Sequence, residues 1–190
     1  MDIDIDFADR EKVLKLIRNV PAAIHRKDGW VKHNTGVFVT EVPTDPVTGW
    51  SSLDYQEAES LGYIKLDLLN VHVYEQIRDE ADLIELMAAG PMWEMLEHRE
   101  FVEQIIHINN HYDTLAKMPE PVNSIPRMAM FLAVIRPAKR HLIGLSWKEV
   151  AKDVWTKPTD GSYSYKKSHS VSYAHLVTVH MNILCKNVIS

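Results

Sequence analysis

Three aspartates in the first half of the chain have the residue type and spacing of a metal site. One residue separates Asp2 from Asp4, so on a strand their carboxylates point to the same face. Asp67 lies in a second apolar run. Carboxylate oxygens are ligands that Mg²⁺ prefers, and a pair of such ions stabilises the attacking and leaving oxygens of a phosphoryl displacement. The aspartates therefore suggest a site for two Mg²⁺ ions, with Mn²⁺ as the alternative metal, although an acidic edge strand explains an Asp-x-Asp pair at least as often.

The pattern of apolar and polar residues predicts the strands that carry these aspartates. Residues 2–7 alternate with period two, which predicts a half-buried strand with acidic side chains on one face. Residues 63–69 predict a strongly apolar strand on which Lys65 and Asp67 share a face. Residues 36–40 form a short β-type run between them. The first part of the chain is therefore expected to form a small sheet of three strands.

Two helices are expected among these strands. Residues 8–24 carry apolar side chains at helical spacing opposed by basic ones, which predicts an amphipathic helix with Asp6 or Asp9 as its N-cap. Residues 54–60 predict a short helical piece.

The second half of the chain is predicted to be helical. Helical spacing begins near residue 71 and breaks at Gly90-Pro91 and again in the Pro-containing loop 119–126. The helical regions expected after the first break are 93–111, 128–135, 147–155 and 168–185. The predicted fold class is α+β, with a small mixed sheet and a helix over residues 1–70 followed by an all-helical part over residues 71–190.

The two halves also differ in charge. Residues 1–125 contain 11 Lys+Arg and 23 Asp+Glu, whereas residues 126–190 contain 10 Lys+Arg and 3 Asp+Glu. Such a chain can bind cations at its acidic end and phosphates at its basic end. Two solvated faces of opposite sign are the simpler interpretation of the charge alone.

Composition favours a cytosolic protein. Its single cysteine, Cys185, excludes an internal disulfide framework and fits a reducing compartment. The acidic start is unlike a signal or transit peptide. No uninterrupted apolar run approaches the roughly 20 residues of a membrane span, so no membrane association is expected.

Five segments of the chain form a series of motifs. They are Asp-Ile-Asp-Ile-Asp-Phe at 2–7, Lys-His-Asn-Thr-Gly-Val-Phe-Val at 32–39, Gly-Tyr-Ile-Lys-Leu-Asp-Leu-Leu-Asn at 62–70, Ala-Val-Ile-Arg-Pro at 133–137 and Tyr-Lys-Lys-Ser-His-Ser-Val-Ser-Tyr-Ala at 165–174. In this order they resemble motifs of the palm and fingers of the bacterial replicative (family C) DNA polymerases, the DNA polymerase III alpha subunit-like enzymes. The Lys-x-Asp and Lys-Ser-His pieces are the most specific.

The resemblance implies a fold and a reaction. Residues 1–70 would be a reduced palm of the polymerase beta-like nucleotidyltransferase type, and residues 71–190 a fingers-like part. The activity implied is Mg²⁺-dependent addition of deoxynucleotides to a primer, with primer-template DNA and a deoxynucleoside triphosphate as partners. The residues implied are Asp2, Asp4 and Asp67 as catalytic metal ligands, and Lys65, Arg136, Lys167 and His169 as nucleotide-binding residues.

Departures from the family pattern leave other functions open. The family's Gly-Ser motif lies upstream of the aspartate strand, where this chain begins, and the interval between Asp6 and Asp67 is too short for the family's thumb. A minimal enzyme, half of a split enzyme completed by a second chain, a template-independent transferase and a non-catalytic DNA-binding or replisome-interaction protein are all compatible with these features. The small size suggests a phage protein acting in the host cytoplasm.

His107 and His111 form a further pair to weigh. Their spacing of four suits a zinc site on a helix, but the pattern His-Ile-Asn-Asn-His places no acidic residue between them. Two ordinary histidines on a helix surface are therefore the favoured interpretation.

Overall fold

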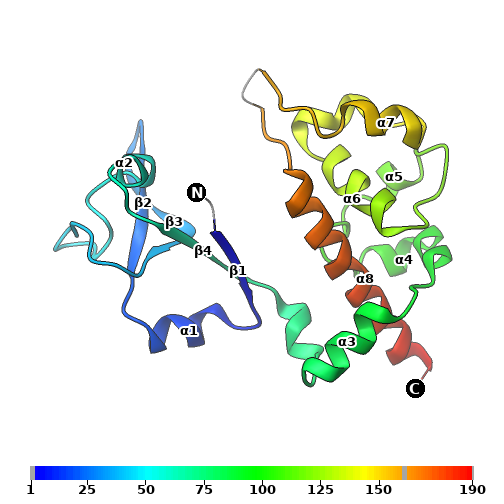
Figure 1. Cartoon of the computed structure of the whole chain (residues 1–190), viewed down its shortest axis with the longest axis horizontal. Coiled ribbons are helices and arrows are strands. Elements are labelled where there is room, and N and C mark those ends of the chain that lie inside the picture. Colours follow the sequence, from blue (N-terminus) through cyan, green and yellow to red (C-terminus); the bar gives the residue numbers. More distant parts are fainter. Residues whose placement is uncertain (1–2, 160–161, 190) are drawn as a thin grey trace. The chain divides into compact units, whose positions relative to one another are not determined.

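The chain folds into two compact units of different secondary structure. The computed structural model describes residues 3–159 and 162–189. Unit 1 is Met1–Gln76 and unit 2 is Ile77–Ser190, whereas the sequence predicted a boundary after residue 70. Unit 1 contains a mixed sheet and unit 2 is helical, so the α+β fold class predicted from the sequence is confirmed (Figure 1).

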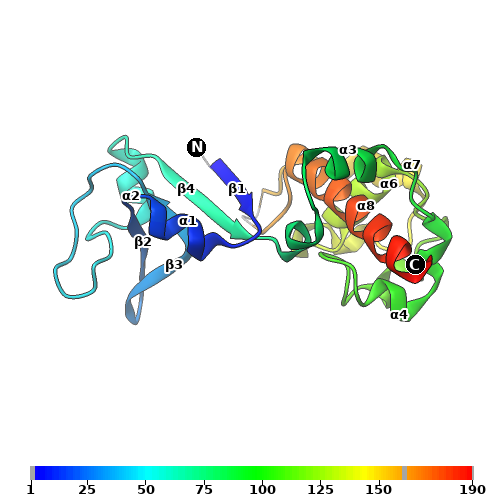
Figure 2. The ribbon, with the colours of Figure 1, turned by 90° about the horizontal axis from the view of Figure 1, so that it is seen from below.

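Unit 1 is built on a four-stranded sheet with the order β1-β4-β3-β2. β1 (Ile3–Phe7) runs parallel to β4 (Lys65–Asn70). β3 (Gly29–Phe38) runs antiparallel to β4 and to β2 (Val20–Arg26). Figure 2 shows β4 between β1 and β3, so β4 has a neighbour on each side. Side chains of β4 are thereby fixed by two strands that are far from it in sequence.

The helix predicted over residues 8–24 is wrong in its second half. α1 is Arg10–Leu16, with Asp9 as its N-cap, and Val20 already belongs to β2. Pro21 explains why the helix does not continue to residue 24, because a proline disfavours helical geometry in the residue before it, here Val20. The Asn19 amide donates to the Leu14 carbonyl at 2.9 Å and so satisfies a carbonyl at the helix end.

The strand predicted over residues 36–40 is longer and begins earlier. β2 and β3 form a hairpin in which Arg26 pairs with Gly29 across a two-residue turn, and Gly29 has φ +117°. The hairpin adds β2, the strand that the sequence analysis did not predict. β2 tolerates Pro21 because it is an edge strand, where a missing N–H breaks no ladder.

Short helices follow the sheet strands in unit 1. α2 is Tyr55–Ser60, close to the helix predicted over 54–60, and η1 is His72–Gln76. The Asp54 carboxylate accepts from Gln56 N, which caps α2, and from His25 N, which attaches the helix to β2; both distances are 2.8 Å.

Unit 2 packs its helices around α6 and α8. The predicted regions 128–135, 147–155 and 168–185 correspond to α6, α7 and α8, but most of 93–111 is only short turns of helix. The elements are α3 (Glu80–Ala88), η2 (Trp93–Glu97), α4 (Arg99–Val102), α5 (Tyr112–Leu115), α6 (Ile125–Val134), η3 (Pro137–Leu142), α7 (Trp147–Asp153) and α8 (Lys167–Ile189).

α8 is the central helix of unit 2, drawn orange to red in Figure 1. It packs against α6 and α3. The buried Asn182 amide donates to Leu86 O at 2.9 Å and Ala89 O at 3.0 Å, so it satisfies carbonyls at the end of α3. In the described part of the chain, no helix combines the length and apolarity needed to cross a membrane.

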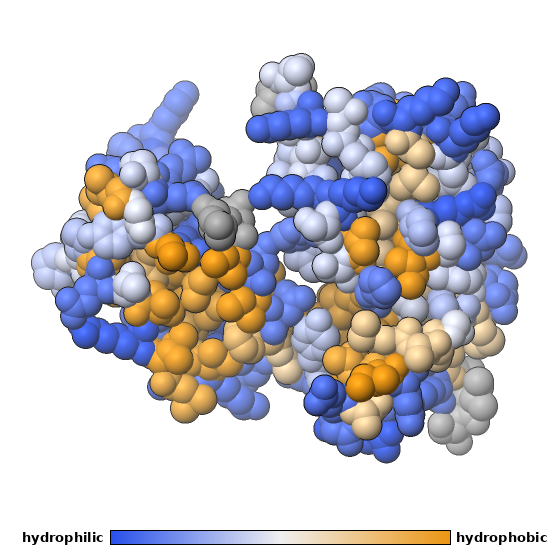
Figure 3. All heavy atoms as spheres, in the orientation of Figure 1, coloured by the Kyte–Doolittle hydropathy of each residue, from blue (hydrophilic) through white to orange (hydrophobic). Residues whose placement is uncertain are grey.

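Apolar side chains are also exposed on unit 1. Figure 3 shows them gathered over α1 and β1. Ile5 of β1 is 36% exposed, and Leu16 and Ile17 at the end of α1 are 84% and 37% exposed. The acidic side chains of β1 point to the other face of this strand, because neighbouring strand residues alternate.

Candidate functional site

The sheet brings Asp4 and Asp67 together on neighbouring strands. Asp4 of β1 is paired with Asp67 of β4 in the parallel register. Paired residues of adjacent strands point to the same face, so both carboxylates and Lys65, two residues before Asp67, share one face of the sheet. Asp2, the third predicted ligand, lies outside the described residues.

Asp67 is a buried carboxylate whose two oxygens each accept a hydrogen bond. The Thr35 hydroxyl donates to Oδ1 at 2.7 Å, and the Lys65 ammonium donates to Oδ2. Burial alone raises the pKa of Asp67, but Lys65, Thr35 and the nearby His33 together hold it below its ordinary value. Asp67 is therefore ionised at neutral pH, and its charge is compensated by Lys65.

His33 fixes the chain beside Asp67. Its Nδ1 accepts from Gly36 N at 2.9 Å and from Thr35 N at 3.3 Å, which requires an unprotonated Nδ1. Burial and the Lys65 charge lower the pKa of His33, against the opposing effect of Asp67. The neutral imidazole thus fixes residues 33–36 of β3, opposite the register shift of β2, where the Thr35 hydroxyl donates to Asp67. Asp67, Lys65, Thr35 and His33 are called the Asp67 cluster below.

Gly36 makes room for Lys65. A Cβ at this position would lie 2.8 Å from Lys65 Cδ and 3.0 Å from His33 Nδ1. The aliphatic part of the Lys65 side chain lies against Gly36, and the Lys65 ammonium lies 5.5 Å from the centre of the Tyr55 ring. The absence of a side chain at residue 36 therefore lets a buried lysine reach Asp67.

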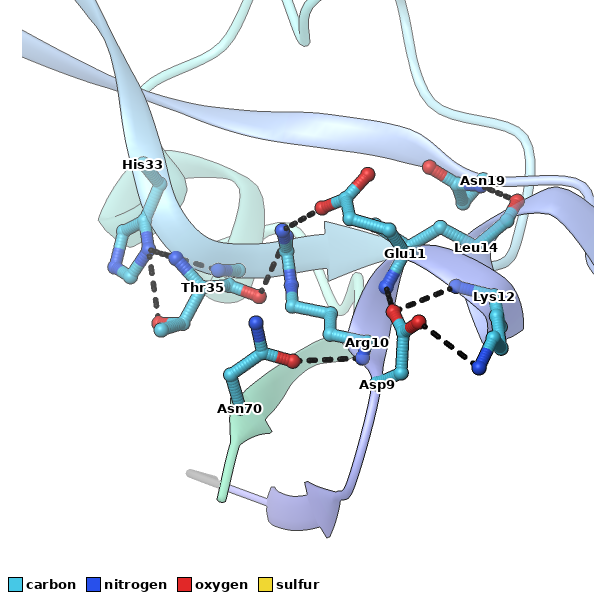
Figure 4. Close-up of polar contacts among 10 residues, drawn as sticks. Asp9, Arg10, Glu11, Lys12, Leu14, Asn19, His33, Thr35 and Asn70 are labelled. Atoms are coloured by element: carbon cyan, nitrogen blue, oxygen red, sulfur yellow. Dashed lines mark hydrogen bonds and ion pairs between the residues drawn. The ribbon is translucent and has the colours of Figure 1, made fainter. Parts of the chain in front are cut away.

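Arg10 supports the same segment of β3 from α1, as Figure 4 shows. Its guanidinium donates to Thr35 O at 3.4 Å and to the Glu11 carboxylate at 3.0 Å. Its backbone N donates to Asn70 Oδ1 at 2.7 Å, which attaches α1 to the end of β4. These contacts fix both strands that contribute to the Asp67 cluster.

Asp6 has a different environment from Asp4. The Tyr74 phenol is hydrogen-bonded to Asp6, and burial followed by the Asp6 charge raises the pKa of that phenol. Asp6 is therefore engaged by η1, whereas Asp4 is an exposed strand residue beside Asp67.

The donor types at Asp4 and Asp67 suit a hard divalent cation. Carboxylates bind Mg²⁺, and each oxygen of Asp67 keeps acceptor capacity beyond the bond from Thr35 or Lys65. Among the described residues, which exclude Asp2, no group of three His, Cys, Asp or Glu side chains is placed to hold a metal ion.

Unit 2 contains a second cluster, made of aromatic rings and Arg136. The Arg136 guanidinium lies over the Tyr165 ring, 4.0 Å from its centre. The His169 ring is 6.0 Å from Tyr165 and 5.1 Å from Tyr173, and His107 is 4.3 Å from Tyr173, all between ring centres. These five residues are called the ring cluster below. It joins two predicted nucleotide-binding residues, Arg136 and His169, through Tyr165.

Three polar atoms in or beside the ring cluster are buried without a hydrogen-bond partner among the described residues. They are Arg136 Nε, His107 Nε2 and Ser170 Oγ. Burial, Arg136 and His169 lower the pKa of His107 to about 4, so its ring is neutral at neutral pH. A buried polar atom with no partner is costly, so the ring cluster offers at least one donor, Arg136 Nε, that an added acceptor would satisfy.

Lys167, the remaining predicted residue, is exposed at the first residue of α8. The first N–H groups of a helix and its macrodipole favour anions at this end. The helix start thus adds to the positive character next to His169, although no described contact joins Lys167 to the rings.

His107 was not predicted as a site residue. His107 and His111 were expected on a helix surface, but His107 lies in a turn with φ +68° and His111 precedes α5. Asn109-Asn110 between them is a turn signal that argues against a continuous helix. Thr35 and His33 were also missed as partners of Asp67, because only the sheet pairing brings them there.

Comparison of the chain with models of protein families, with curated proteins and with solved structures gives no match.

Proposed function

We propose that this chain is a Mg²⁺-dependent nucleotidyltransferase core, which adds deoxynucleotides to a DNA primer in the manner of a reduced family C polymerase. Asp4 and Asp67, with Asp2 from the resemblance, would hold the metal ions, for which Mn²⁺ is the alternative. The ions would neutralise charge on the transferring phosphoryl group. The primer-template DNA and a deoxynucleoside triphosphate are the proposed partners, and the host cytoplasm is the proposed location.

The pairing of Asp4 with Asp67 is the observation that carries this proposal. Two carboxylates on one sheet face, with Lys65 on the same face, combine metal ligands with a cation for phosphate oxygens. Lys65 is held beside Asp67 in the structure, so its role toward a nucleotide requires an exchange of the carboxylate for a phosphate oxygen.

The ring cluster supports a nucleotide-binding role for unit 2. Phosphate oxygens accept hydrogen bonds, and a bound phosphate would give Arg136 Nε the acceptor that it lacks among described residues. Tyr165 and His169 supply ring faces on which a base can stack. Lys167 would add positive charge at the start of α8.

A second candidate is a DNA-binding protein without catalytic activity. Its support is the Lys65–Asp67 pair, because the carboxylate is already compensated without a metal ion. In such a protein the acidic face would be a structural element, and the ring cluster alone would contact nucleic acid.

Primer extension tests the leading proposal. The purified chain is incubated with Mg²⁺ or Mn²⁺, deoxynucleoside triphosphates and a primer, with and without a template strand. We expect extension by the wild type and a loss of at least about a hundredfold in Asp4→Asn, the order of effect expected when charge stabilisation of a transition state is removed. Dependence on the template would distinguish polymerisation from untemplated addition.

Asp28→Asn is the matched control. Asp28 lies exposed in the turn between β2 and β3, so the same charge is removed from unit 1 away from Asp67. The melting temperature of each chain is also measured with and without Mg²⁺ and a triphosphate, because a ligand that binds only the folded chain raises the melting temperature. Equal extension by Asp4→Asn and the wild type would exclude the proposed site, and DNA binding without extension or metal stabilisation would favour the second candidate.

A further inference from the structure

An open pocket of about 490 Å³ lies in unit 2 between η2, α5 and the loop before α6. Trp93 and Leu96 line it from η2, Tyr112 and Leu115 from α5, and Val122 from the loop. None of these residues belongs to the ring cluster. The pocket is therefore a separate feature with a mainly apolar lining.

The walls of the pocket are held by the core. Leu96 and Val122 are each 4% exposed and belong to the hydrophobic core of unit 2. The Tyr112 hydroxyl donates to Glu97 O at 2.9 Å, which joins α5 to η2. Because these contacts already fix both sides, the pocket exists without a ligand.

The rim of the pocket is acidic. Glu94 and Glu97 line it and are exposed, and neither carboxylate forms an ion pair with another described residue. Residues 93–123 contain six Asp+Glu and two Lys+Arg, whereas residues 126–190 are basic. This acidic rim therefore attracts cationic partners.

We propose that this pocket binds a short peptide segment of a partner protein that combines apolar and basic side chains. The apolar side chains would enter between Trp93, Leu96 and Leu115, and Lys or Arg side chains would lie against Glu94 and Glu97. An apolar floor with a polar rim is the common arrangement of protein interfaces. Charge complementarity selects a basic segment over an acidic one.

The geometry favours a peptide over a small organic cation. A site for a small cation places aromatic faces around the charge. Here the Arg99 guanidinium already lies 4.4 Å from the centre of the Tyr112 ring, and the carboxylates lie at the rim instead of the floor. The Glu94 and Glu97 carboxylates are thus placed to contact basic side chains of a peptide outside the pocket, while apolar side chains of the same peptide lie inside it.

Fluorescence anisotropy with a labelled amphipathic peptide of Leu and Lys tests the proposal on the full chain. We expect saturable binding that weakens about tenfold in Glu94→Gln/Glu97→Gln, since rim charges contribute on the order of 1.4 kcal/mol together. Glu80→Gln/Glu100→Gln is the matched control, because it removes two exposed carboxylates of unit 2 outside the pocket. This control is expected to bind as the wild type does.

Three outcomes would overturn the proposal. The first is equal weakening in the two double variants, which would indicate attraction to net charge alone. The second is equal binding of a peptide with Glu in place of Lys. The third is competition by benzyltrimethylammonium at the same concentration as unlabelled peptide, which would assign the pocket to a small organic cation.

Discussion

The Asp67 cluster of unit 1 and the ring cluster of unit 2 satisfy their buried polar groups to different extents. Both oxygens of Asp67 accept hydrogen bonds, and His33 accepts two from the backbone. In unit 2, Arg136 Nε and His107 Nε2 are buried without a partner among the described residues. One cluster is internally compensated, and the other contains buried polar atoms without described partners.

This difference indicates at which cluster a bound ligand forms new contacts without displacing existing ones. At the Asp67 cluster, a cation must compete with Lys65 for the carboxylate, so binding there involves exchange of partners. At the ring cluster, an anion adds a hydrogen bond from the buried Arg136 Nε without displacing any of the hydrogen bonds described. We therefore expect the ring cluster to bind phosphate compounds before the acidic face is loaded.

The largest expected effect comes from breaking the compensation at Asp67. Lys65→Met should lower the free energy of unfolding of unit 1 by about 4 kcal/mol, because removing one partner leaves a buried carboxylate uncompensated. Hydrogen exchange of the β4 amides measures this change in unit 1 alone. Lys65→Met/Asp67→Asn should recover most of the loss, since the remaining buried charge is removed as well.

Lys12→Met is the control for this experiment. The Lys12 side chain is 80% exposed and its ion pair with Asp9 is on the surface, so its loss should cost no more than about 0.5 kcal/mol. A Lys65→Met chain as stable as Lys12→Met would contradict the description of Lys65 as a compensating cation.

The second effect concerns the uncompensated cluster and depends on pH. The pKa of His107 is about 4 in the folded chain and near 6.5 when unfolded, so the unfolded chain binds the extra proton between these values. The stabilisation from neutral His107 is complete above pH 6.5 and is lost as the pH falls from 6.5 to 4. We expect the free energy of unfolding of unit 2 to fall by roughly 3 kcal/mol over this pH range because of His107.

His107→Asn isolates this contribution. Asparagine tolerates the positive φ of residue 107 and does not titrate between pH 6.5 and 4. The decrease in the free energy of unfolding over this range should therefore be smaller in His107→Asn by the amount that His107 contributes. His180 is buried and has a lowered pKa, and it remains in both chains as a common background. Urea unfolding of unit 2 at several pH values gives the comparison, and identical pH profiles for the two chains would refute the assignment.

Local patterns were sufficient for the elements that carry the unit 1 residues. Period-two alternation predicted β1, and a strongly apolar run predicted β4 with Lys65 and Asp67 on one face. Neither pattern could predict that Asp4 lies opposite Asp67, because the register joins strands about 60 residues apart and depends on the intervening hairpin. The hairpin itself was obscured by apolar residues after α1 that also fit helical spacing.

The ring cluster shows the same limit in unit 2. Arg136 and His169 were predicted from the family resemblance, but Tyr165 and Tyr173, which pack around them, carry no chemical signature of their own in the sequence. His107 lies in a turn that is distant from Arg136 in the sequence. Its burial and its lowered pKa result from tertiary packing beside Arg136. Packing between distant segments, which the sequence pattern does not specify, therefore created the cluster.

The smallest of the three effects tests how closely the Asp67 cluster is packed. Gly36→Ala should lower the free energy of unfolding of unit 1 by about 2 kcal/mol, because the new Cβ meets Lys65 Cδ at 2.8 Å and a packed site must shift to accept it. Gly90→Ala is the control, since a Cβ at Gly90 meets no atom within 4 Å. The shift should also move Lys65 from Asp67 and raise the pKa of that carboxyl, which NMR titration measures. An unchanged Asp67 titration together with unchanged stability would mean that the lysine stem moves aside freely, and that its position over Gly36 does not determine the pair.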